Sequence, residues 1–218
     1  MSATDAEERV REALEELAAR SSVVGALIAT HGPYTPRRAA SPDVFGALSR
    51  AIVYQQLAGK AASVIHGRFV ALLGGDVTPR AALEIDPEHI RAAGLSRAKR
   101  DAVLDLARHC VSGALELDVL EALDDETLTR SLCRVRGVGP WTAHMFQIFT
   151  LGRLDVWPTG DLAVRRGFGR AFGRDVPTAK DLKPLGDPFR PYRSIVAWYC
   201  WRVQDTPTPD GEPGSSKG

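Results

Sequence analysis

Apolar residues recur every three to four positions along most of the chain, the spacing of helices that bury one face. The clearest stretches are 1–20, 43–52, 61–73, 96–107, 124–135, 141–150, 162–172 and 195–203, with shorter ones at 78–85 and 87–93. No stretch alternates convincingly with a period of two residues, as a half-buried strand would. The pattern therefore predicts an all-α protein.

The turns between these stretches carry recognisable signals. His31-Gly32-Pro33-Tyr34 ends the apolar run 23–28. Gly74-Gly75 ends the predicted helix 61–73, and Ser96 is a predicted N-cap. Residues 115–123 read as a linker with short helical turns, and 175–188 as a polar, proline-containing loop. Residues 204–218 are poor in apolar side chains, so we expect a disordered tail.

Composition excludes several classes of protein. The 218 residues suffice for one large domain or two small helical lobes, and 44% hydrophobic with 25% charged residues is ordinary for a globular chain. The three cysteines are far apart and the five histidines lack ligand spacing, so we expect neither a disulfide framework nor a metal site. The N-terminus is unlike a signal peptide and no apolar run is as long as a membrane span. We expect a cytoplasmic protein with no membrane partner.

A glycine turn, Gly137-Val138-Gly139-Pro140, separates two of the predicted helices. Glycine adopts positive φ and leaves the backbone bare, while proline suits the first position of a new helix. Backbone amides at such a helix start bind anions, so Gly137, Val138, Gly139 and Thr142 are candidate contacts to a nucleic-acid backbone. An ordinary tight linker between two helices is the alternative.

The charge around this turn favours the first interpretation. Between residues 130 and 174 there are eight arginines and two aspartates, a net charge of +6, whereas the whole chain carries +1. Basic residues gathered in one segment are typical of a phosphate binder. A solvated helical face remains the alternative.

Three motifs carry a resemblance to a known family. L-x-x-V-x-G-V-G-P-W-T-A (132–143), L-G-R-x-D-V-W-P (151–158) and D-L-A-V-R-R-G (161–167) resemble the helix-hairpin-helix (HhH-GPD) DNA glycosylase superfamily, and within it the 3-methyladenine DNA glycosylase II (AlkA) type. Weaker matches extend from about 44 to 201. The resemblance implies two helical lobes with a cleft between them, 43–158 and 1–42 with 159–203. It also implies no iron–sulfur cluster here, since the four cluster cysteines are missing, and no N-terminal β-rich domain.

The family's catalytic aspartate falls on Asp161, and the neighbouring Asp155 looks structural. Cleaving an N-glycosidic bond builds positive charge on the sugar, which a fixed carboxylate stabilises while it helps orient water. Asp161 also precedes a predicted helix, so simple N-capping is the alternative role, and the two roles are compatible.

Trp141 stands where bifunctional relatives carry a lysine that forms a Schiff base. No lysine occurs between Arg100 and Ala179, so we expect no lyase activity. Trp141 resembles instead the wall on which a flipped base stacks, and an indole face attracts a cationic alkylated purine.

The motif P-Y-R-S-I-V-A-W-Y resembles the family's P-W-R-S…W-Y and gives Trp198 as the opposite wall, with Trp201 as the second choice. The family's other tyrosine wall positions fall on Met145 and Leu162. Core packing is the alternative for each tryptophan, Trp141 included.

Residues 54–62, Y-Q-Q-L-A-G-K-A-A, resemble the family segment that fills the gap left by the flipped base. Side chains that enter the minor groove in this way unstack one base step. Gln56 or Leu57 would be the plug, and a polar corner between two helices is the alternative.

Together these observations predict a monofunctional glycosylase for alkylated bases in base excision repair, a monomer acting on damaged duplex DNA in the nucleoid. No organic cofactor is implied; some relatives hold a monovalent cation at the hairpin carbonyls. Two alternatives stay open, a glycosylase for deaminated, oxidised or mismatched bases and a non-catalytic DNA-binding module.

Overall fold

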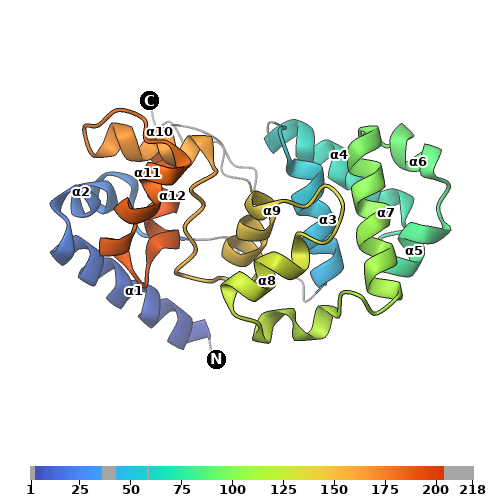
Figure 1. Cartoon of the computed structure of the whole chain (residues 1–218), viewed down its shortest axis with the longest axis horizontal. Helices are drawn as coiled ribbons and strands as arrows, with labels where there is room; N and C mark the ends of the chain where they lie inside the picture. The colour runs from blue at the N-terminus through green and yellow to red at the C-terminus, as the bar shows by residue number, and fades with distance from the viewer. Residues whose placement is uncertain (1–2, 36–42, 58, 204–218) are drawn as a thin grey trace. The chain divides into compact units, whose positions relative to one another are not determined.

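The computed structural model of the chain (Figure 1) describes residues 3–35, 43–57 and 59–203. Helices form throughout these residues, and none of them lies in a strand, so the predicted all-α class is confirmed. The chain divides into two compact units, treated separately here. The hairpin unit contains described residues 43–152, and the terminal unit contains 3–35 together with 153–203. Residues 153–158, which the sequence had placed in the central lobe, therefore belong to the terminal unit.

The hairpin unit is built around the packing of α3 and α5 on either side of α7, visible in Figure 1. Its large buried side chains include Phe45, Phe69, Leu106 and Phe146, which form one continuous core. The elements in order are α3 (Val44–Tyr54), α4 (Gly59–Leu72), α5 (Pro79–Glu84), α6 (Pro87–Ala92), α7 (Arg97–Val111), the short 3-10 helix η1 (Leu117–Ala122), α8 (Asp125–Leu132), α9 (Pro140–Met145) and a π-helical turn η2 (Phe146–Thr150).

The terminal unit is organised around α12 (Arg193–Val203), whose residues 194–201 are all buried. Around it lie α1 (Ala3–Arg20), α2 (Ser22–His31), α10 (Leu162–Ala171), α11 (Ala179–Leu185) and the 3-10 turn η3 (Asp187–Phe189). The contact between α10 and α12 is very close, because a Cβ atom on Gly167 would lie 1.9 Å from the carbonyl oxygen of Cys200. Only glycine fits there without moving one helix.

Helix starts carry side-chain caps, two of which, Ser96 and Asp161, were predicted from the sequence. Asp43, Thr78, Ser96, Asp124 and Asp161 each accept a hydrogen bond from a backbone amide in the first turn of the helix that follows. Gly32 caps the end of α2 with a φ of 78°, a conformation that glycine adopts without strain.

Two α-helices were not predicted from the sequence: α2, of which only the apolar run 23–28 was noted, and α11. Residues 175–188 were expected to be a loop, but they contain α11, whose N-cap Thr178 accepts from the amide of Asp181. Pro184 lies in the last turn of α11, where the helix ends within two residues, so the proline marks its end.

Two further findings concern the described residues only. Within 3–35, 43–57 and 59–203, no helix is both long and apolar enough to cross a membrane. No cluster of three or more His, Cys, Asp or Glu side chains there could hold a metal ion. The tail 204–218, predicted to be disordered, lies outside the described residues.

Candidate functional site

Asp161 is held rigidly at the start of α10. Its side chain is 7% exposed, and its Oδ1 accepts from the amide of Val164 at 2.8 Å and from Nε1 of Trp201 at 3.3 Å. The capping role expected from sequence is therefore present. A second, indole donor holds the same oxygen, and capping alone does not require it.

The two candidate tryptophans of α12 are placed differently from the sequence expectation. Trp198, the first choice for a pocket wall, is 2% exposed. Its ring lies edge-on to Tyr34 at 5.5 Å and beneath the guanidinium of Arg202 at 4.4 Å. Trp198 therefore packs in the core of the terminal unit, as does Trp201 at 1% exposed, and a place for either ring in a base pocket stays a prediction. Trp201, the second choice, is the one that contacts Asp161.

Cys200 lies between these two tryptophans in α12 and is fully buried. Burial, and after it the nearby charge of Asp161, raise the pKa of its thiol well above the usual range. A thiol with a raised pKa is a poor nucleophile. Cys200 therefore packs near Asp161 as a structural residue, and we do not expect it to act as a nucleophile.

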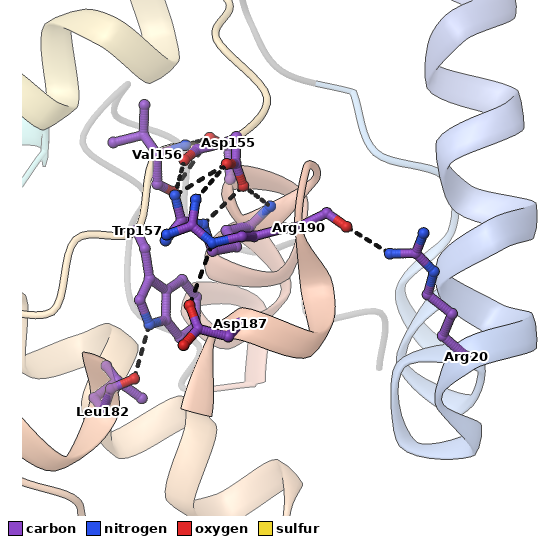
Figure 2. Close-up of polar contacts among 9 residues, drawn as sticks. Arg20, Asp155, Val156, Trp157, Leu182, Asp187 and Arg190 are labelled. Atoms are coloured by element: carbon purple, nitrogen blue, oxygen red, sulfur yellow. Dashed lines mark hydrogen bonds and ion pairs between the residues drawn. The ribbon is translucent and has the colours of Figure 1, made fainter. Parts of the chain in front are cut away.

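Asp155 has the structural role expected of it (Figure 2). Its Oδ1 accepts from Nε of Arg193 at 2.7 Å, and its Oδ2 accepts from Arg190 at 3.0 Å. A second guanidinium nitrogen of Arg193 donates to the Asp155 carbonyl at 2.8 Å. This ion-paired cluster ties the segment that leads to Asp161 onto the start of α12.

The hairpin turn between α8 and α9 has a positive φ at only one of its two glycines, Gly137, whereas Gly139 has a φ of −104°. Gly137 has a φ of 75°, and a Cβ atom there would lie 3.0 Å from Cβ of Ala102 in α7. A Cβ atom on Gly139 would meet nothing within 4 Å, so the backbone there is open to a close approach. Gly139 is the N-cap of α9 and gives its first amides no side-chain acceptor. Val138, by contrast, is buried, so any contact it makes to DNA is through its backbone.

Thr142 faces inward rather than towards a ligand. It is 2% exposed, and its Oγ1 accepts from Nε2 of Gln55 at 2.8 Å. The same Gln55 nitrogen donates to the carbonyl of Gly137 at 3.0 Å. The hydroxyl of Thr142 therefore supports the hairpin from inside, and a contact between its backbone amide and phosphate stays a prediction.

Trp141 and Met145 line one recess of the hairpin unit. Arg50, Tyr54 and Phe149 lie in the same wall, with the guanidinium of Arg50 over the Tyr54 ring at 4.1 Å. Three of these five side chains are aromatic, so the recess offers an aromatic wall. Leu162 belongs to the terminal unit, where its side chain is 44% exposed at the start of α10.

Gln56 and Leu57 form an exposed turn after α3. Leu57 is 38% exposed, and Gln56 has a φ of 54°, the only positive φ at a described residue other than glycine. Sequence reasoning singled out these two residues but missed Gln55, which joins the turn to the hairpin.

Comparison with known proteins places these features in a family. The model of the HhH-GPD superfamily, described as base excision DNA repair proteins, matches residues 49–189. DNA-3-methyladenine glycosylase 1 of Schizosaccharomyces pombe is 34% identical over 183 residues, covering 81% of this chain and 80% of that protein. The S. pombe alkylbase DNA glycosidase-like protein mag2 is 30% identical, covering 81% of this chain and 85% of its own length.

Solved structures give the same result. The S. pombe 3-methyladenine DNA glycosylase Mag1, in complex with abasic DNA, matches with a TM-score of 0.81 and 32% identity, covering 88% of this chain and 95% of that one. A DNA-3-methyladenine glycosidase from Bacillus halodurans matches with a TM-score of 0.75 and 32% identity, covering 88% of each chain.

Proposed function

Because this chain belongs to the HhH-GPD superfamily of base excision DNA repair proteins, we propose that it is a monofunctional DNA glycosylase for alkylated bases. Its substrates are bases of the 3-methyladenine and 7-methylguanine type in duplex DNA. The names of the similar proteins support this substrate class, and the complex of one of them with abasic DNA supports DNA as the partner.

The observation that carries the proposal is the fixed carboxylate of Asp161. Two donors orient Oδ1, and burial keeps much of the surrounding water away. As the N-glycosidic bond breaks, the sugar gains positive charge, and a carboxylate that needs no reorientation stabilises that charge at little cost. The same carboxylate would help orient the water that attacks the anomeric carbon. Alkylation at N3 or N7 makes a purine a good leaving group, so no general acid is required.

The absence of strand cleavage follows from the distribution of amines. Trp141 stands at the lysine position of the lyase relatives, and no lysine occurs from residue 100 to 179. Lys99 lies just before this stretch, but its Nζ donates to the carbonyls of Val53 at 2.7 Å and Gln55 at 2.6 Å. Both carbonyls hold the Lys99 nitrogen at the end of α3, so it is not placed to attack the abasic sugar, and no Schiff base is expected.

Base and backbone binding are assigned to the hairpin unit. The partly buried indole of Trp141, with Met145 beside it, offers a face on which a cationic purine would stack. The open backbone at Gly139 would bind phosphate through its amides, with a monovalent cation at the carbonyls as an option. Gln56 or Leu57 would fill the gap in the duplex. The enzyme would act as a monomer and needs no organic cofactor.

The test uses methylated duplex DNA and the purified full chain. We expect release of 3-methyladenine and 7-methylguanine, with strands cut only after alkali. Borohydride added during turnover should trap no covalent protein–DNA adduct. Release of neutral deaminated or oxidised bases alone would favour a different lesion class, and DNA binding without any release would favour a non-catalytic module. Adducts trapped by borohydride would refute the monofunctional assignment.

A further inference from the structure

The turn that would enter the duplex is strained and must be held in place. Helix α3 ends at Tyr54, Gln55 follows as its C-cap, and Gln56 then takes a φ of 54°. A side chain such as glutamine adopts this left-handed conformation only at a cost of about 1–3 kcal/mol. An exposed turn with such a residue keeps one shape only if its surroundings determine it.

Lys99 supplies the first part of that support. It lies in the first turn of α7, partly buried, and its ammonium donates to the carbonyls of Val53 and Gln55 at 2.7 and 2.6 Å. These carbonyls belong to the C-terminal end of α3, where helix carbonyls lack partners and a cation is favoured. Burial lowers the pKa of Lys99, because it disfavours the charged ammonium.

Gln55 supplies the second part. While its carbonyl accepts from Lys99, its side-chain amide donates to the Gly137 carbonyl at 3.0 Å and to Thr142 Oγ1 at 2.8 Å. The residue next to the strained Gln56 is thus fixed by its backbone to α7 and by its side chain to the hairpin. The turn before α4 and the turn before α9 are joined through one residue.

Helix α7 also holds the hairpin directly. Ala102 packs closely on Gly137, where a Cβ atom would lie 3.0 Å from the Ala102 Cβ, and Oδ2 of Asp105 accepts from the amide of Arg136 at 2.8 Å. Lys99, Ala102 and Asp105 are spaced three residues apart, so they lie along one side of the helix. One face of α7 therefore sets the positions of both turns.

We propose that Lys99 is a positioning residue that couples the exposed turn Gln56–Leu57 to the hairpin turn Gly137–Gly139. When the hairpin binds the DNA backbone, the rigid link through Lys99 and Gln55 fixes the position of Gln56 and Leu57 relative to the stacked bases. Lys99 acts through the protein and not as a direct phosphate contact, since its ammonium is engaged by two carbonyls. The proposal rests on the proposed function of this site as a base-flipping glycosylase.

The coupling predicts a specific defect in Lys99→Met. Methionine keeps an unbranched apolar stem but donates nothing, so the exposed turn loosens while α7 stays packed. We expect affinity for duplex DNA containing a tetrahydrofuran abasic analogue to fall about tenfold, as loss of a charged hydrogen-bond donor allows. Affinity for undamaged duplex should change less than about twofold, because non-specific binding depends on phosphate contacts. Lys183→Met, at an exposed lysine of α11 in the terminal unit, is the matched control and should change neither.

The salt dependence separates positioning from phosphate contact. The slope of log affinity against log salt should be the same for wild type and Lys99→Met, because no released counterion belongs to Lys99. A slope smaller by about one, with equal weakening on undamaged and abasic DNA, would make Lys99 a phosphate ligand and overturn the proposal. Equal affinity of wild type and variant for both DNAs would also overturn it.

A second variant guards against misfolding. Gln55→Met breaks the same link at its hairpin end, and it should show the same selective loss as Lys99→Met. If both residues act in one link, the double variant should be no weaker than either single variant, so their effects are not additive. Additive losses would overturn the link.

Abasic-site binding needs no catalysis. Absence of base release by the wild type would therefore refute the proposed function, while these binding outcomes would still decide the role of Lys99.

Discussion

The indole Nε1 of Trp201 donates to Oδ1 of Asp161 at 3.3 Å, joining α12 to the residue that begins α10. Val164 donates to the same oxygen from within α10. The carboxylate is therefore oriented from two directions by groups that lie far apart in the sequence. A simple helix cap requires only the second of these bonds.

Replacing Trp201 by phenylalanine tests the orienting role of the indole. Trp201→Phe keeps a large apolar ring but removes the donor to Asp161. Because the bond is long, we expect a loss of about 1 kcal/mol of transition-state stabilisation, or roughly fivefold in the single-turnover rate of base release. Trp157→Phe is the matched control, since Trp157 donates its Nε1 to the carbonyl of Leu182 at 2.9 Å instead of to Asp161. Equal rates for wild type and Trp201→Phe would contradict the role.

The two neighbouring aspartates should separate stability from catalysis. Asp155 pairs with Arg190 and Arg193, and the side chain of Arg193 is only 13% exposed. Asp155→Asn should lower the free energy of unfolding by roughly 1–3 kcal/mol, because it weakens charge-assisted bonds that are partly shielded from water. Base release per folded molecule should stay near the wild-type rate. Urea unfolding and single-turnover kinetics on the same preparation check both parts, and a large rate loss without destabilisation would make Asp155 catalytic.

The contact between α10 and α12 should tolerate no side chain at Gly167. A Cβ atom would lie 1.9 Å from the carbonyl oxygen of Cys200, so Gly167→Ala forces the helices apart. We expect a loss of about 1–3 kcal/mol in the free energy of unfolding, typical of overpacking. Gly67→Ala in α4 is the control, because a Cβ there meets nothing within 4 Å and alanine favours a helix. The control should be neutral or slightly stabilising, and equal effects of the two would show that α10 and α12 are less closely packed than described.

His66 should make the protein less stable in mild acid. Burial, and after it the charge of Arg50, lower the pKa of His66 from 6.5 to about 4. As the pH falls below 6.5, His66 takes up a proton in the unfolded chain but not in the folded one. The free energy of unfolding is therefore highest above pH 6.5 and decreases as the pH falls towards 4. Because the ring is only partly buried, we expect a loss of about 2 kcal/mol across that range. His66→Gln, unfolded in urea at pH 7 and pH 4.5, should lose less stability than wild type, and identical losses would contradict the shift.

Local signals predicted most of the fold. An N-cap accepts hydrogen bonds from amides two or three residues away, so Ser96 and Asp161 could be recognised from neighbouring residues alone. Helix α11 was missed because its proline and polar composition resemble a loop, although Pro184 occurs only in the last turn. The helix is fixed by the burial of Leu182 and by the bond from Trp157 to its carbonyl, which the local sequence does not reveal.

The site was predicted less completely, because its decisive contacts are between distant residues. Trp198 and Trp201 lie three residues apart on one helix, and spacing alone does not tell which of them meets Asp161. Gln55 and Gly137 are 82 residues apart, and Lys99 and Gln55 are 44 apart. No periodicity or motif joins such residues, so the supporting role of Thr142 and the link through Gln55 became visible only in the folded chain.

The most direct test of the central claim compares Asp161→Asn with wild type in single-turnover release of 3-methyladenine from methylated duplex DNA. Asparagine caps a helix as well as aspartate does, so folding should be preserved, and binding to abasic-analogue DNA should change little. The account predicts a rate lower by about 10²–10³-fold, the loss expected when charge stabilisation of the transition state is removed. A variant that folds, binds abasic DNA and releases the base within about tenfold of the wild-type rate would contradict a catalytic role for Asp161.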